Sequence, residues 1–153
     1  MLKKIIKFLL ILVCMGIIFS FSQDNGAVST KKSDSIIISI TEKFFGRKLT
    51  TKEKVKYTDR FVVVVRKGGH LFLYFLLGLS IISFLREYMI ISYKSVIITC
   101  VCVFMYACSD EIHQLFIKDR SGEILDVFID TIGGFVGSYL YYLLFRIRRS
   151  IHE

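Results

Sequence analysis

Side chains able to carry out acid–base or metal chemistry lie within or beside apolar stretches of this chain, where such side chains are rare. They fall in three segments and comprise His70, Tyr74, Asp110, Glu111, Gln114, Asp126 and Asp130. In a helix, His70 and Tyr74 are four residues apart and share one face. An acidic side chain among apolar neighbours is costly unless it finds a partner. These residues therefore point to contacts inside the protein, and together to a functional site.

The last of these segments has a regular spacing. Asp126, Asp130, Gly133 and Gly137 are separated by steps of four, three and four, so they form one stripe along a helix. The two glycines make a G-x-x-x-G pattern, which allows another helix to approach closely. We therefore predict that the acidic and the small residues of this helix face the same helix–helix contact.

The residue types allow two kinds of chemistry and one structural role. Asp110, Glu111, Asp126 and His70 are candidate catalytic residues, because carboxylates and imidazole can transfer protons or hold a divalent metal. The spacing matches no metal-site signature, and no nucleophile motif such as G-x-S-x-G is present, so no cofactor is expected. The acids could instead cap helices or pair with cations, and for Asp126, at a predicted helix start, a cap is physically sensible.

A second group of residues suits ligand binding. It comprises Lys67, Tyr74, Gln114, Arg120 and Asp130. Arg120, Lys67 and the neighbouring Arg66 are suited to phosphate or carboxylate, since cations make strong charge-assisted hydrogen bonds to these groups. Acid and amide side chains are suited to hydroxyl or amine groups. The two groups together favour a polar site at one end of the elements that carry them.

The elements that must position these residues are membrane-spanning helices. Hydrophobic residues make up 54% of the 153 residues, and the mean hydropathy is +0.57. This composition excludes a disordered chain and disfavours a water-soluble enzyme. The apolar residues form long runs, and in a bilayer only helices or closed barrels satisfy every backbone group. We predict an all-α polytopic membrane protein, a four-transmembrane-helix bundle forming one domain over residues 1–153.

The predicted spans cover residues 5–21, 69–85, 89–108 and 124–145. The first resembles a signal peptide in its basic start, but no small-residue cleavage pattern follows it, which favours an uncleaved span. The four cysteines lie inside or at the end of apolar runs without a C-x-x-C pair. We expect them to be apolar side chains in the membrane rather than disulfides or metal ligands.

A polar stretch, residues 22–67, separates the first two spans. Within it, Ile37, Ile40, Phe44 and Phe45 recur near helical spacing beside lysine and arginine. This pattern predicts an amphipathic helix. The helix could lie on the membrane surface or pack against the spans, and the pattern alone does not separate these alternatives.

The net charge of +8 is attributed to cations flanking the spans, so no nucleic-acid partner is expected. Lysines before the first span and arginines after the last place both termini in the cytoplasm. The basic stretch 22–67 opposes this orientation, but a short trilysine tail is hard to translocate. Either orientation brings the span ends that carry His70, Asp110 and Asp126 to the same membrane face.

Several segments of this sequence resemble the motifs of the VanZ-like family. They are residues 66–78 (RKGGHLFLYFLLG), 109–116 (SDEIHQLF), 120–122 (RSG) and 126–134 (DVFIDTIGG), with a weaker likeness at 19–23 (FSFSQ). The resemblance extends from about residue 19 to about residue 140. One departure is Lys118-Asp119, where many members have Pro-Gly before the arginine.

The resemblance implies a multi-pass protein of the bacterial cytoplasmic membrane, in a family named for an accessory protein of teicoplanin resistance. It implies a cell-envelope context but no reaction. We expect a module that binds an envelope lipid, a lipid-linked precursor or the lipid-tailed glycopeptide at the extracytoplasmic face. A membrane-embedded enzyme acting on a lipid-linked substrate, with or without a divalent metal, and a scaffold subunit of a membrane complex stay open as alternatives.

Overall fold

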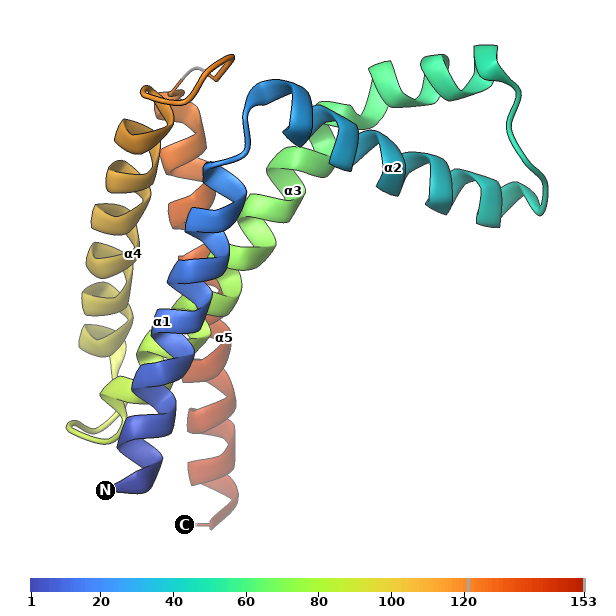
Figure 1. Cartoon of the computed structure of the whole chain (residues 1–153). Helices are drawn as coiled ribbons and strands as arrows, with labels where there is room; N and C mark the ends of the chain where they lie inside the picture. Colours follow the sequence, from blue (N-terminus) through green and yellow to red (C-terminus); the bar gives the residue numbers. More distant parts are fainter. Residues whose placement is uncertain (121, 153) are drawn as a thin grey trace.

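The computed structural model describes residues 1–120 and 122–152, and this part of the chain is helical without strands (Figure 1). Its helices are α1 (Leu2–Ser22), α2 (Gly26–Phe45), α3 (Thr51–Leu85), α4 (Tyr93–Gln114) and α5 (Ile124–His152). All except α2 are long and apolar enough to cross a membrane. The predicted all-α fold with four spans is confirmed. Ser121, in one of the motifs quoted above, lies outside the described residues.

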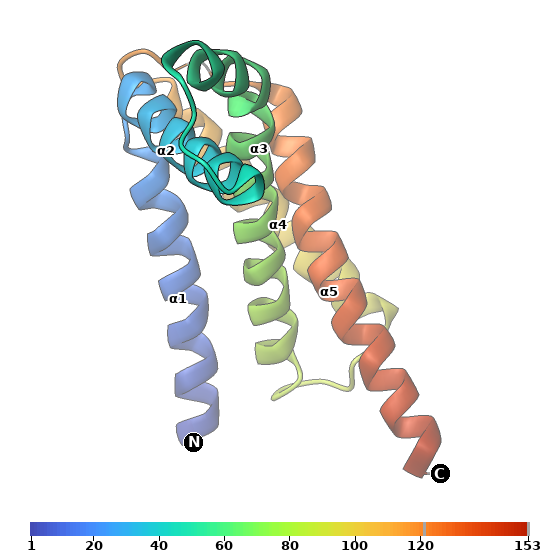
Figure 2. The same ribbon diagram turned by 90° about the vertical axis from the view of Figure 1, so that its right-hand side faces the viewer.

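The four long helices run side by side and place both termini at one end of the bundle (Figures 1 and 2). α5 packs mainly against α3 and α4, and α1 packs against α3. The bundle interior is formed by buried side chains that include Ile18, Tyr74, Leu77, Val103 and Ala107. Many leucine, isoleucine and phenylalanine side chains point outward instead, as expected for a surface that contacts lipid. All four cysteines are free.

All four long helices extend beyond the predicted spans, and the extensions of α3 and α4 bear on the site. The predicted span 69–85 is the C-terminal part of α3, whose earlier turns leave the bundle (Figure 1). α4 runs from Tyr93 to Gln114, so it begins and ends later than the predicted span 89–108. The helix continues because Asp110 and Gln114, four residues apart, are buried and bonded to each other. The acids of this segment therefore project from a rigid helix.

α2 and the N-terminal part of α3 form a hairpin arm that projects sideways at the end of the bundle opposite the termini (Figures 1 and 2). Asn25 caps α2 by accepting a hydrogen bond of 2.9 Å from the Val28 amide. α2 ends at Phe45 and is capped by Gly46, whose φ of 65° is left-handed and favours glycine. Thr50 and Glu53 then form a capping box that starts α3. These local signals turn the chain back on itself.

α2 is the amphipathic helix predicted within residues 22–67. Its Ser33 and Ile37 side chains are buried, whereas Ile36 and Ile40 are exposed. Because the arm leaves the bundle sideways at one end of the spans, we expect its exposed apolar face to lie where lipid headgroups meet acyl chains. α2 thus packs on α3 through one face and leaves another face exposed.

Tryptophan placed at Ile40 is expected to report lipid contact by the arm. The chain contains no tryptophan, so Ile40→Trp introduces a single fluorophore. Its emission should be blue-shifted in vesicles and quenched by brominated lipids, because the side chain enters the apolar boundary. Ser35→Trp, at an exposed position on a different face of α2, is the matched control and should emit as in water. Equal emission from both variants would show that the arm does not lie on the membrane.

Glycines bring α3 and α5 into close contact. A Cβ atom added to Gly78 would fall on the backbone of Gly134, and one added to Gly137 would fall on the backbone of Phe75. The G-x-x-x-G stripe that begins at Gly133 therefore faces α3, as predicted. In lipid, where apolar side chains gain little from leaving the solvent, such backbone proximity is a main source of helix association.

Candidate functional site

The polar residues gather at the end of the bundle opposite the termini, beside the base of the hairpin arm. α1 and α4 end in this region, α5 begins in it, and α3 enters the bundle through it (Figure 1). Segments far apart in sequence thus contribute side chains to one membrane end, as predicted from the order of the spans.

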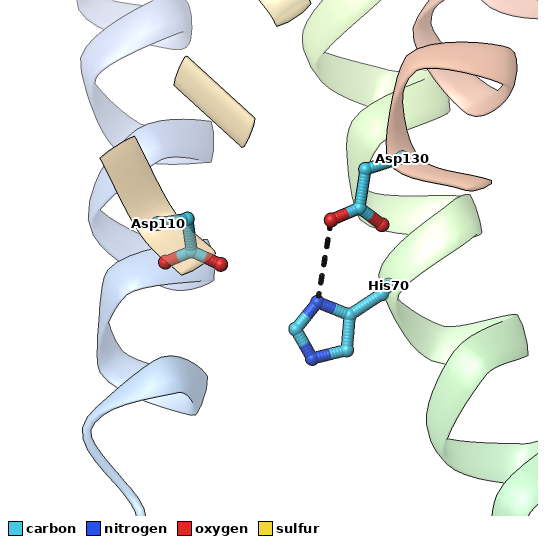
Figure 3. Close-up of side chains that lie close together, drawn as sticks. All are labelled: His70, Asp110 and Asp130. Carbon is cyan, nitrogen blue, oxygen red and sulfur yellow. Dashed lines mark ion pairs between the residues drawn. The ribbon is translucent and has the colours of Figure 1, made fainter. Parts of the chain in front are cut away.

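A histidine and two carboxylates form a buried cluster at the centre of this region (Figure 3). His70 comes from α3, Asp110 from α4 and Asp130 from α5, and each offers one ligand atom within 4.8 Å of the other two. His70 Nδ1 lies 4.0 Å from Asp130 Oδ2, which is too long for a hydrogen bond. Asp110 is 3% exposed and Asp130 is 0% exposed. The structure thus joins two candidate catalytic residues with a candidate ligand-binding residue.

The carboxylate oxygens of this His70–Asp110–Asp130 cluster have few hydrogen-bond donors. Asp110 Oδ2 accepts hydrogen bonds from the Ser22 hydroxyl at 2.8 Å and from Gln114 Nε2 at 3.2 Å. Asp110 Oδ1 and both Asp130 carboxylate oxygens are buried and have no hydrogen-bond partner among the described residues. The sequence analysis did not identify Ser22 as a site residue. Its position in the FSFSQ segment, which resembles a family motif, was the signal that could have pointed to it.

Glu111, Gln114 and Arg120 form a network that fixes the connection between α4 and α5. Gln114 Nε2 donates to Glu111 Oε1 at 2.9 Å, and the Glu123 amide donates to Glu111 Oε2 at 2.9 Å. Arg120 donates to Gln114 Oε1 at 2.9 Å and to the Phe21 carbonyl at 2.8 Å. The candidate catalytic residue Glu111 and the candidate ligand-binding residue Gln114 therefore have their polar atoms engaged in holding this loop.

Lys67 and Asp126 form an ion pair between α3 and the start of α5. Lys67 Nζ lies 2.5 Å from Asp126 Oδ1 and 3.0 Å from Glu123 Oε2. This pairing separates Asp126 from the buried cluster, although Asp126 and Asp130 share one helix stripe. For Asp126, the structure therefore agrees with the structural alternative given above, in which an acid pairs with a nearby cation.

Tyr74 lies in the bundle interior, one helical turn beyond His70 in α3. It is 0% exposed, and its hydroxyl group has no hydrogen-bond partner among the described residues. Its ring packs against Tyr106, with ring centroids 6.1 Å apart, and the Tyr106 hydroxyl donates to the Met15 carbonyl at 2.8 Å. Tyr74 is therefore a buried polar group of the interior and does not line the pocket described next.

A pocket of about 260 Å³ opens beside the buried cluster, where the end of α1, the start of α2 and the middle of α3 meet. Apolar side chains such as Phe21, Val65 and Phe72 form much of its wall. His70 also lines it and thereby connects the pocket with the carboxylates behind. The shape and lining are suited to a ligand that has both an apolar and a polar part.

Three cations face the same pocket: Lys32, Arg66 and Arg120. Lys32 pairs with Asp24 at 2.6 Å, whereas Arg66 has no hydrogen-bond or ion-pair partner among the described residues. Burial lowers the pKa of the Arg120 guanidinium from its ordinary value, and the nearby charge of Arg66 acts in the same direction. An anion in the pocket would relieve the repulsion between these two arginines.

Comparison with known proteins identifies the family of this chain. The sequence model of the VanZ/LLP1 family matches residues 7–146, nearly the whole chain. No curated protein and no solved structure matches the chain. The chain therefore belongs to the VanZ/LLP1 family, as a membrane protein linked through that family to glycopeptide resistance.

Proposed function

We propose that this protein binds the anionic headgroup of a lipid-tailed envelope component in the pocket beside His70, and that this binding confers tolerance to teicoplanin. The ligand is an envelope lipid, a lipid-linked precursor or the lipid-tailed glycopeptide itself. One observation carries the proposal. A single pocket at this end of the bundle has an apolar wall and also contains Arg66, a cation without a partner among the described residues.

The contacts assign different roles to the candidate ligand-binding residues. Arg66 is the cation best placed to contact an anion, since Lys67 is engaged by Asp126 and Glu123. Arg120 lines the pocket while it also ties the α4–α5 connection to Gln114, so it both shapes the pocket and adds positive charge. Apolar side chains along the wall would accommodate the first part of an acyl chain.

Replacing Arg66 with glutamine is expected to weaken binding of a phosphate headgroup. Loss of one charge-assisted hydrogen bond costs about 1.5–3 kcal/mol, which corresponds to a roughly 10- to 100-fold rise in Kd. The measurement is the Kd of a short-chain phosphatidic acid for the purified protein, with phosphatidylcholine of the same chain length for comparison. Arg60→Gln, an exposed cation of the arm that does not line the pocket, is the matched control. Equal Kd values for both variants and the unaltered protein would contradict the proposed pocket.

The proposal also requires the pocket to face the outside of the cell, with both termini in the cytoplasm. In a cysteine-free background, a cysteine at Lys118 should react with a membrane-impermeant maleimide on intact cells, and one at Ser150 should react only after lysis. Both side chains are exposed, and they lie at opposite ends of the bundle. The reverse labelling pattern would place the pocket on the cytoplasmic side and would overturn the proposed action at the outer face.

A further inference from the structure

We propose that His70, Asp110 and Asp130 bind one divalent transition-metal ion, of the Zn²⁺ or Mn²⁺ type, behind the pocket. The three side chains come from α3, α4 and α5, so the ion would join three membrane helices. The ion would be held by the buried cluster and not by the cations proposed to contact the headgroup, although His70 borders the pocket as well.

The ligand set fits such an ion. Imidazole nitrogen and carboxylate oxygen are the usual non-sulfur ligands of Zn²⁺, and carboxylates also suit Mn²⁺. Metal–ligand bonds of about 2.0–2.2 Å hold tetrahedral ligand atoms about 3.3 Å apart. The present distances, 4.0 Å between His70 Nδ1 and Asp130 Oδ2 and at most 4.8 Å within the cluster, require a closure of roughly 1 Å to reach those bond lengths. We expect rotation of the side chains to close this distance when the ion binds.

The burial of the carboxylates is the second and independent observation. Asp130 is fully buried, and neither of its oxygens has a hydrogen-bond partner among the described residues. Asp110 Oδ1 is also buried without a hydrogen-bond partner among the described residues. Two buried carboxylates without donors carry a large desolvation cost unless a cation or protons neutralise them. A divalent ion would neutralise both and would supply a partner to each.

Neighbouring groups support the ligands in the way that metal sites require. The Ser22 hydroxyl and the Gln114 amide both donate to Asp110 Oδ2, which holds the carboxylate in place and leaves Oδ1 for the ion. Such supporting hydrogen bonds orient ligands and raise metal affinity. With three protein ligands, one position of a tetrahedral ion stays open, and His70 borders the pocket. If the proposed function holds, the anionic headgroup could bind the ion at that open position.

The test measures metal binding by the full-length protein, purified in detergent with a tag that lacks histidine. Protein treated with a chelator and reloaded with Zn²⁺ or Mn²⁺ is expected to retain about one equivalent by elemental analysis, and its Tm should rise on reloading. Co²⁺ should give visible absorption bands of a low-symmetry site with nitrogen and oxygen ligands. A folded wild-type protein that takes up none of these ions would overturn the proposal. It would indicate that protons, and not a metal ion, neutralise the two carboxylates.

Variants decide whether the ion lies in this cluster. Asp130→Asn and His70→Gln should each raise the metal Kd by about tenfold or more, since even a supporting residue contributes 10- to 100-fold. Both should lose the metal-dependent gain in Tm and the Co²⁺ bands, while the melting of their chelator-treated forms shows that they fold. Asp59→Asn, an exposed carboxylate of the arm, is the control and should bind as the wild type does. Unchanged binding in the cluster variants would overturn the site. Lipid binding is not measured, so this result is separate from that of the Arg66 experiment.

Discussion

Gly137→Leu is expected to prevent stable assembly of the bundle. The Cβ atom of any side chain at this position would meet the backbone of Phe75 and Leu79 in α3. Backbone cannot move aside as the tip of a flexible side chain can, so α3 and α5 would have to separate. Overpacking in a well-packed core typically costs about 1–3 kcal/mol and sometimes more, and a contact with backbone should fall at the upper end. The measurement is the Tm of the purified protein together with its abundance in the membrane.

Gly16→Leu in α1 is the matched control for this substitution. Apart from its chain neighbours and the backbone of its own helix, no atom lies within 4 Å of the Cβ position of Gly16, and the residue is exposed. Leucine should therefore be tolerated there with little change in Tm. If Gly137→Leu and Gly16→Leu were equally well tolerated, the glycine contact would not be what holds α3 against α5.

Replacing the buried cluster is expected to abolish protection without unfolding the protein. His70→Gln and Asp110→Asn keep side-chain shape and hydrogen-bonding capacity, but they remove the groups that transfer protons, carry charge or bind a metal. Teicoplanin tolerance in cells should fall to the level seen without the protein, while membrane abundance stays near the wild-type value and Tm stays near that of the metal-free wild-type protein. Removal of a buried carboxylate with unpartnered oxygens should if anything raise the stability of the metal-free protein.

Asp59→Asn provides the comparison for the tolerance experiment, because Asp59 is exposed on the arm and remote from the cluster. It should leave tolerance unchanged. Full tolerance in the His70→Gln, Asp110→Asn double variant would assign the cluster a purely structural role and would favour the scaffold alternative. Loss of tolerance together with loss of the protein from the membrane would instead assign both residues to folding.

The sequence by itself determined the elements of this protein and the faces of its helices. Long apolar runs specified four spans, because a backbone in lipid must satisfy its hydrogen bonds within each helix. Spacing alone placed Gly133 and Gly137 on one stripe, and the structure shows that this stripe contacts α3. The order of the spans also brought their polar ends to one membrane end. These properties depend on residues near one another in the chain, so local periodicity reveals them.

Only the tertiary structure decided which polar residues meet. Asp130 faces His70, whereas Asp126, one turn earlier, pairs with Lys67. Asp110 points into the cluster, whereas its neighbour Glu111 bonds to the α4–α5 connection. Periodicity shows which residues share a helix face, but not how far each helix is rotated against its neighbours. That rotation follows from how closely the glycines let α3 approach α5, and from where α1 and α4 then pack on this pair.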